Sequence, residues 1–232
     1  GNRSVVVVGD ETLARVHAHC LDPDLLIASA AALGSVSRVK AEDMGAQHER
    51  FKASGSGAGV RVAVLAMSRG AGFDSVFESL GVNVSDLGYV EKPPVGQIVE
   101  AAEALRVPDV IVLANHKNVR LAAEQAISLA RCTIHLVPTA SLPQGVAAAM
   151  AFDPEETAAV NVAAMTAAAR AIRTVEVTVA AASRTADGVA VAAGEAIALL
   201  DGRLMGATVG RDDALLAGLE AAEVAAGSLI TI

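Results

Sequence analysis

Three short polar segments each follow an apolar run of the sequence and precede a stretch in which apolar residues recur with helical spacing. They are residues 68–72 (SRGAG), 115–118 (NHKN) and 139–145 (TASLPQG). Ligands of parallel sheets bind beyond the carboxyl ends of the strands, where helix N-termini present free backbone N–H groups. The residues that we expect to bind a ligand or a partner are therefore Ser68, Arg69, Gly70, Asn115, His116, Lys117, Asn118, Thr139, Gln144 and Gly145.

Each segment also has a purely structural interpretation. Arg69 could hold an anion, but glycines between a strand and a helix commonly serve tight turn geometry. Asn118 could be the N-cap of the next helix with Lys117 in solvent, and a hydroxyl of the third segment could cap a helix that starts at Pro143. The sequence contains no P-loop, no GxGxxG and no GxSxG nucleophile turn. We therefore assign no catalytic residue.

Two histidines form a second candidate site. His17 and His19 alternate on a strand-like segment, and alternate residues of a strand point to one face. Two imidazole nitrogens on one face could bind a zinc ion at about 2 Å. Cys20 would face the other way, so a third ligand must come from elsewhere, for instance from His48 or from a residue outside this sequence. The alternative is a pair of edge-strand histidines without a metal.

The composition disfavours several classes of function. The 232 residues are 53% hydrophobic, which is enough for one large domain or two modest ones. A net charge of −8 disfavours nucleic-acid binding, and 2% aromatic residues leave few stacking surfaces for single strands or sugars. We expect neither a transmembrane segment nor a signal peptide. Two cysteines without a CxxC pair are typical of a reducing compartment, so we expect a cytoplasmic protein.

The apolar pattern predicts the α/β class. Near-continuous apolar runs alternate with helical periods up to residue 172, which is typical of a largely parallel sheet buried between helices. From residue 175 the period is two, which predicts an antiparallel extension with hairpin turns at Asp187–Gly188 and Asp201–Gly202. The predicted strands are 61–67, 82–84, 110–114, 133–137, 175–181, 189–191, 196–200, 203–208 and 229–232. The predicted helices are 73–80, 95–106, 119–130, 143–150, 155–172 and 212–225.

A run of small residues divides the chain into two predicted domains. Residues 53–59 belong to the segment KASGSGAG, which is typical of a flexible linker. Residues 2–52 then form part of a small α/β domain, with strands 5–8, 13–19 and 36–42 and a helix 24–33 capped by Asp22. Residues 60–232 form the main domain. Because a strand begins so near the start, we expect the chain to enter a longer protein partway through.

Several stretches resemble the fatty acid kinase A subunit family, whose members are also described as dihydroxyacetone-kinase-like or Dak phosphatase proteins. VPTASLPQGVAAAMAFDP (137–154), ANHKNVRLAAEQA (114–126) and DGVAVAAGEAIALLDGRL (187–204) are similar to its carboxyl-terminal domain. RVHAHCLDP (15–23) and EDMGAQHE (42–49) are similar to its middle domain. The resemblance covers nearly the whole chain.

The resemblance implies a role within a larger kinase. In that family a helical domain, absent from this chain, binds ATP and magnesium, and a separate DegV-type B subunit holds the fatty acid whose carboxylate is phosphorylated. It also implies a dimerising middle domain in which His17 and His19 bind zinc with a cysteine from an upstream segment. The carboxyl-terminal domain would dock the B subunit through segments 115–118 and 139–145.

We therefore expect the non-nucleotide-binding portion of a fatty acid kinase, which serves for partner docking and for formation of a homodimer. This portion alone is not expected to be an active enzyme. Two alternatives stay open. One is a scaffold that binds a small molecule or a protein without catalysis. The other is a phosphatase, as one family description suggests, although the sequence offers no obvious nucleophile for it.

Overall fold

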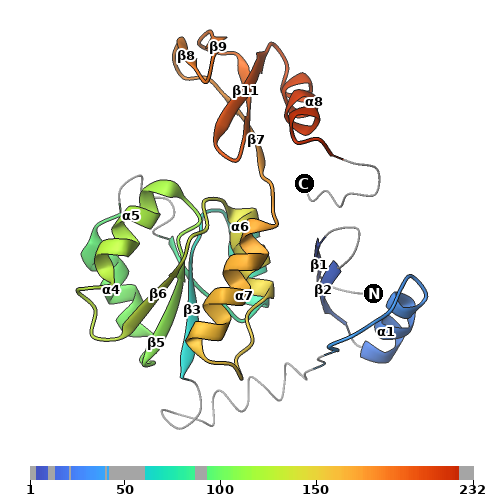
Figure 1. The fold of residues 1–232 in the computed structure, drawn as a ribbon, viewed down its shortest axis with the longest axis vertical. Helices are drawn as coiled ribbons and strands as arrows, with labels where there is room; N and C mark the ends of the chain where they lie inside the picture. The colour runs from blue at the N-terminus through green and yellow to red at the C-terminus, as the bar shows by residue number, and fades with distance from the viewer. Residues whose placement is uncertain are drawn as a thin grey trace.

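The computed structural model describes residues 4–9, 14–20, 22–39, 41, 61–86 and 93–224. Three units follow one another along the chain (Figure 1). The first is a small β-β-α unit, the second an α/β unit with a parallel sheet, and the third an antiparallel sheet with one helix. The α/β class and the change from parallel to antiparallel strands are as predicted. The predicted linker 53–59 lies outside the described residues.

The central unit has one parallel sheet with the strand order β4-β3-β5-β6. Its strands are β3 (Val62–Met67), β4 (Asn83–Ser85), β5 (Asp109–Leu113) and β6 (Thr133–Val137). Its helices are α3 (Ala71–Ser79), α4 (Val95–Ala104), α5 (Lys117–Ala126), α6 (Leu142–Met150) and α7 (Ala158–Arg170). All four strands run in one direction, so their carboxyl ends share one edge.

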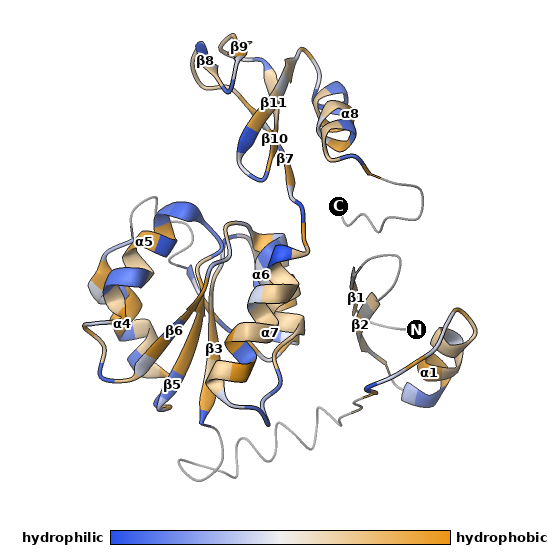
Figure 2. Cartoon of the chain, viewed as in Figure 1, coloured by the Kyte–Doolittle hydropathy of each residue, from blue (hydrophilic) through white to orange (hydrophobic). Residues whose placement is uncertain are grey.

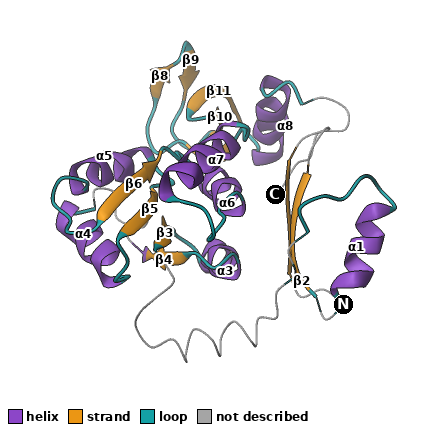
Figure 3. Ribbon diagram, turned by 60° about the horizontal axis from the view of Figure 1, so that its bottom comes forward, coloured by secondary structure: helices purple, strands orange, loops and turns teal. Residues whose placement is uncertain are grey.

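Helices cover both faces of this sheet, which is why its strands are apolar along their whole length. Alternate residues of β3 contribute to different cores: Val64 and Ala66 pack with Phe77 of α3 and Met165 of α7. Leu65, on the other face, packs in the core that α4 and α5 cover. The helix layers on the two sides are visible in Figure 3, and Figure 2 shows hydrophobic residues concentrated on the strands between them.

The third unit is antiparallel, as the period-two pattern predicts. Its strands are β7 (Val175–Val179), β8 (Arg184–Ala186), β9 (Val189–Val191), β10 (Ala196–Leu200) and β11 (Arg203–Thr208), followed by α8 (Arg211–Ala221). The sheet order is β11-β10-β7, and β8 pairs with β9. Both predicted Asp-Gly turns have positive φ at both residues, as a tight hairpin requires (51° and 83°, then 49° and 82°). The predicted strand 229–232 lies outside the described residues.

The first unit has an antiparallel pair, β1 (Ser4–Gly9) and β2 (Ala14–His19), followed by α1 (Pro23–Ala31). Asp22 caps α1 as predicted, because its Oδ1 accepts a hydrogen bond from Leu25 N at 3.2 Å. The predicted strand 36–42 is wrong for residues 36–39 and 41, which have no strand pairing. Alternation alone predicted that strand, and without a partner strand the backbone has no ladder to join.

Candidate functional site

The carboxyl edge of the parallel sheet gathers one residue from each predicted polar segment. Leu113 pairs with Ala66 on one side and with Val137 on the other. Two residues further along the chain lie Ser68 after β3, Asn115 after β5 and Thr139 after β6. The exposed fractions of these residues are 1%, 6% and 0%. We call these three residues the polar row. They lie at the ends of three neighbouring strands, although the first and the last are 71 positions apart in the sequence.

Hydrogen bonds join the loops through Asn115. Its backbone N–H donates to Thr139 Oγ1 at 3.0 Å, and its side-chain Nδ2 donates to the carbonyl oxygen of Met67 at 3.0 Å. Asn115 has a φ of 56°, in the left-handed region that Asn tolerates better than most residues. The ends of β3, β5 and β6 are therefore held together by one amide side chain and one hydroxyl.

Gly145 completes this arrangement from α6. A Cβ atom at this position would collide with the Asn115 amide. The residue is buried, so its lack of a side chain serves the close approach of α6 to the Asn115 loop. The sequence predicts Gly145 as a binding residue, and the structure gives it a packing role within the same edge.

Gln144, a predicted binding residue, and the neighbouring Ser141 form hydrogen bonds within the segment at the start of α6. Gln144 Oε1 accepts a hydrogen bond from Ala140 N at 2.8 Å, which folds the amide back over the loop. Ser141 is the N-cap of α6, because its Oγ accepts from Gln144 N at 3.4 Å. The Ser141 hydroxyl also shares a 2.8 Å hydrogen bond with the hydroxyl of Thr174, just before β7.

The start of α5 differs from the structural interpretation of the sequence. His116, not Asn118, is the N-cap, and its Nδ1 accepts a hydrogen bond from Asn118 N at 3.2 Å. An imidazole is an uncommon N-cap, so the usual preference for Asn favoured the wrong residue. Lys117 occupies the first helical position and is exposed. No ion pair joins it to another described residue.

Arg69 and Gly70 form the turn between β3 and α3. Arg69 is exposed, and within the described part of the chain it has no ion-pair partner. Gly70 is the N-cap of α3 with a φ of 100°, which a residue with a side chain rarely adopts. The turn therefore requires glycine at position 70, and Arg69 beside it is an exposed cation.

Two oxygens of the polar row are buried without a hydrogen-bond partner, namely Ser68 Oγ and Asn115 Oδ1. Buried polar atoms are nearly always satisfied in folded proteins, and leaving one unpaired costs about 1–3 kcal/mol. Both oxygens are enclosed by the protein, and Asn115 Oδ1 faces the backbone of Gly145, so they lower the stability of this edge and do not form an opening for a ligand.

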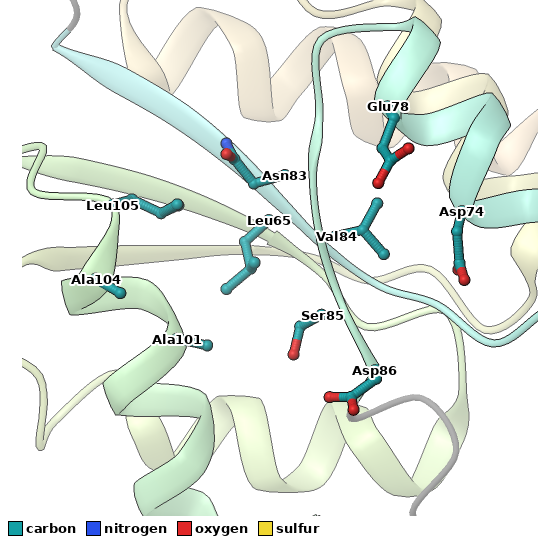
Figure 4. Close-up of a pocket in the computed structure, with 10 residues that line it drawn as sticks. All are labelled: Leu65, Asp74, Glu78, Asn83, Val84, Ser85, Asp86, Ala101, Ala104 and Leu105. Carbon is teal, nitrogen blue, oxygen red and sulfur yellow. The ribbon is translucent and has the colours of Figure 1, made fainter. Parts of the chain in front are cut away.

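A groove beside β4 is a separate feature, which the polar segments did not predict. It has a volume of about 550 Å³ and crosses the edge strand, with α3 on one side and α4 on the other (Figure 4). Its apolar lining comes from Leu65, Val84, Ala101, Ala104 and Leu105, and its carboxylates are Asp74, Glu78 and Asp86. Asp74 Oδ1 is buried without a partner. Asp74 and Glu78 are four residues apart on α3 and share one face of that helix, whereas Asp86 follows β4, and no sequence motif predicts that the three meet.

The metal prediction stays untested. His17 and His19 both belong to β2, where they pair with Val6 and Ser4 of β1. Their side chains and residue His48 lie outside what the structure describes. Among the described side chains, no cluster of three His, Cys, Asp or Glu residues could hold a metal ion. Cys20 and Cys132 are free thiols, and burial raises the pKa of the Cys132 thiol.

A His–Asp pair lies between β5 and β6, away from the polar row. His135 Nε2 and Asp109 Oδ1 are 2.7 Å apart, and each side chain is about a quarter exposed. Asp109 is the first residue of β5, so this pair lies toward the amino ends of the strands.

Within the described ranges, no helix is long and apolar enough to cross a membrane.

The fold and the site together define an α/β protein whose parallel sheet ends in a hydrogen-bonded polar edge. Comparison with known families identifies it further. Residues 63–232 match the model of the C-terminal domain of fatty acid kinase A-subunit-like proteins, and residues 1–51 match the model of their middle domain. The chain belongs to this fatty acid kinase A-subunit-like family, as the resemblance in its sequence predicted.

Three relatives illustrate the similarity. Protein YloV of Bacillus subtilis is 28% identical over 212 residues, which cover 88% of this chain and 38% of YloV. An uncharacterized protein of Staphylococcus haemolyticus is 27% identical, covering 87% of this chain and 39% of that protein. One of Staphylococcus aureus is 27% identical, with coverages of 87% and 38%. The chain thus spans about two fifths of the length of these relatives.

Proposed function

We propose that this chain is the non-nucleotide-binding portion of the A subunit of a fatty acid kinase, and that the carboxyl edge of its parallel sheet docks the partner subunit. In this proposal ATP and magnesium bind elsewhere in the longer protein. The partner is a DegV-type B subunit that holds the fatty acid. The longer protein phosphorylates the carboxylate of that fatty acid with ATP.

One observation carries the docking proposal: loops from three strands are tied together at one edge by Asn115. Its bonds to Met67 and Thr139 hold the loops in fixed positions before any partner arrives. A surface that is already ordered loses less conformational entropy when a protein binds to it. Exposed Lys117 and Arg69 stand on this ordered base, where they can contact another protein.

Replacement of Lys117 by Ala in the full-length A subunit tests the docking role. The side chain is exposed and forms no ion pair within the described chain, so its removal should leave the fold intact. We expect a loss of affinity for the B subunit of about tenfold, equivalent to about 1.4 kcal/mol, measured by isothermal titration calorimetry. Arg203→Ala, which changes an exposed residue of β11, is the control and should bind like the unaltered protein.

An unchanged affinity in Lys117→Ala would remove the case for this loop. Association with some protein other than a DegV-type subunit would favour the scaffold alternative. Release of phosphate from a generic ester by the purified chain would instead favour the phosphatase alternative.

We also propose that His17 and His19 contribute to a zinc site that a segment outside this sequence completes. Their positions two residues apart on β2 support this, because the backbone is extended there. We expect the full-length protein to retain zinc through dialysis and its variant with both histidines replaced by Ala to lose it. Equal zinc content in the two proteins, measured by atomic absorption, would contradict the proposal.

A further inference from the structure

The groove beside β4 lies at an open edge of the parallel sheet. Among the described strands, β4 pairs with β3 alone and is the outermost strand. The hydrogen bond from Ser68 N to Ser85 O shows that the backbone of Ser85 faces β3. In a parallel ladder such residues alternate with residues whose N–H and C=O point to the other side. The backbone of Val84, which lines the groove, therefore points away from β3, and the sheet can accept one more strand here.

The two walls of the groove differ in chemistry (Figure 4). On the sheet face where Val84 packs, α3 contributes Asp74 and Glu78 to the groove. On the other face, which α4 covers, the lining is apolar and consists of Leu65, Ala101, Ala104 and Leu105. The side chains of an added strand would alternate between these two walls. One set would meet carboxylates, and the other set would meet an apolar surface.

The carboxylates of the groove have no cation beside them in the described part of the chain. Asp74, Glu78 and Asp86 form no ion pair with a described residue, and the described lining includes neither lysine nor arginine. Glu78 lies in the last turn of α3, where the helix dipole favours a cation and disfavours a carboxylate. The stability of α3 therefore does not explain this residue. The uncompensated negative charge favours a cation that comes from outside the chain.

We propose that this groove binds an extended, basic segment of a partner protein, which adds to β4 as a further strand of the sheet. A backbone C=O of the segment accepts a hydrogen bond from Val84 N–H, and a backbone N–H donates to Val84 C=O. Its lysine or arginine side chains face the carboxylates, and the apolar side chains between them pack on the α4 wall. The groove volume, about 550 Å³, lies within the range of known ligand sites. This binding is separate from the docking of the B subunit at the polar row.

A second copy of this chain does not suit the same groove. Pairing of two β4 strands would bring the carboxylates of one copy against those of the other, and like charges that face each other across an interface repel. The net charge of −8 adds to that repulsion. The charge of the groove therefore favours a basic partner with a different sequence.

Binding of a synthetic peptide tests the proposal. The probe is a capped, dye-labelled hexapeptide in which Lys alternates with Leu, and fluorescence anisotropy measures its affinity for the chain. The groove variant, Glu78→Gln with Asp86→Asn, removes two exposed carboxylates of the groove and keeps the shape of the side chains. The control variant, Glu100→Gln with Glu220→Gln, removes two exposed carboxylates that do not line the groove. Both variants have the same net charge, so the general attraction of a basic peptide to an acidic protein is equal in the two.

We expect the groove variant to bind the peptide about tenfold more weakly than the unaltered chain, and the control variant less than about twofold more weakly. Addition of a strand also gives the Val84 amide a hydrogen bond, so its hydrogen exchange, measured by NMR, should slow when the peptide binds. A peptide with proline in place of one central leucine keeps its charges but loses a backbone donor. This peptide should bind about fivefold more weakly than the original.

Equal affinities of the groove variant and the control variant would overturn the proposal, because the peptide would then be attracted only by the net charge of the protein. Binding that leaves the hydrogen exchange of the Val84 amide unchanged would exclude an added strand and would also overturn it. Analytical ultracentrifugation tests for a second copy in the groove. A dimer of the chain that the groove variant abolishes would identify a second copy as the occupant and contradict the proposal.

Discussion

The two halves of the parallel sheet are built in different ways, with the polar row at the carboxyl ends of β3, β5 and β6 and the groove along the edge strand β4. On the side of β5 and β6, the polar row is buried and hydrogen bonds join neighbouring loops. On the side of β4, the groove has an apolar lining and three carboxylates, and one backbone bond from Ser68 N to Ser85 O, 3.0 Å long, reaches across to β3. Cations flank the first half and carboxylates the second.

The first half is an ordered surface, and the second half is a more open one. The polar row uses its polar groups to hold loops together, so its surface is fixed and mainly its outer cations are left for a partner. In the groove Glu78 and Asp86 are exposed to whatever enters, whereas one oxygen of Asp74 is buried. A protein that contacts both halves must therefore match a basic surface and an acidic one, which favours one orientation over its reverse.

The strongest test of the ordered half is Gly145→Ala. The added methyl group would collide with the Asn115 amide and force it away from Met67 O. Overpacking of this kind costs roughly 1–3 kcal/mol, so the free energy of unfolding in urea should fall by that amount. Affinity for the B subunit should fall as well, because the loops lose their fixed positions.

Gly96→Ala is the control for Gly145→Ala, since it is a glycine-to-alanine change in an open part of a helix. It should stabilise the protein by up to about 1 kcal/mol. Asn115→Ala removes the amide itself and should lower stability without a collision. If Gly145→Ala were as stable as the unaltered protein, the packing of α6 on Asn115 would not order this edge.

A smaller effect is expected in the groove. The double variant Asp74→Asn and Glu78→Gln removes two negative charges and keeps the shape of the side chains. If the B subunit docks chiefly on the basic half, its affinity should change by less than about threefold. A larger loss of affinity, measured by the same calorimetric titration, would show that the B subunit contacts the acidic half more than the basic half.

Much of the fold could be predicted from the sequence because burial on both faces leaves a strong signal. The apolar runs predict β3, β5 and β6 within a residue or two, and Asp-Gly pairs locate two hairpins. The three-residue strand β8 was not predicted, since Arg184–Ala186 has too few apolar residues to show alternation. Residues 36–39 and 41 show the opposite error, because alternation without a partner strand does not make a sheet.

The candidate site was predictable only in its outline. Strand direction alone predicts that polar segments after parallel strands share an edge, and Asn115 and Thr139 do meet there. The role of each residue depends on distances that no local pattern contains. His116 caps α5 in place of Asn118, Gly145 serves packing, and Ser68 is buried.

The hydrogen bond between Ser141 and Thr174 has a mechanical consequence. Ser141 starts α6 at the docking edge, and Thr174 leads into β7 of the antiparallel sheet. Thr174 N also donates to Asp201 Oδ1, 2.9 Å away, in the turn between β10 and β11. A short relay of three residues therefore links the first turn of α6 to a distant hairpin, and a shift of that turn by a bound protein would pull directly on the neighbouring sheet.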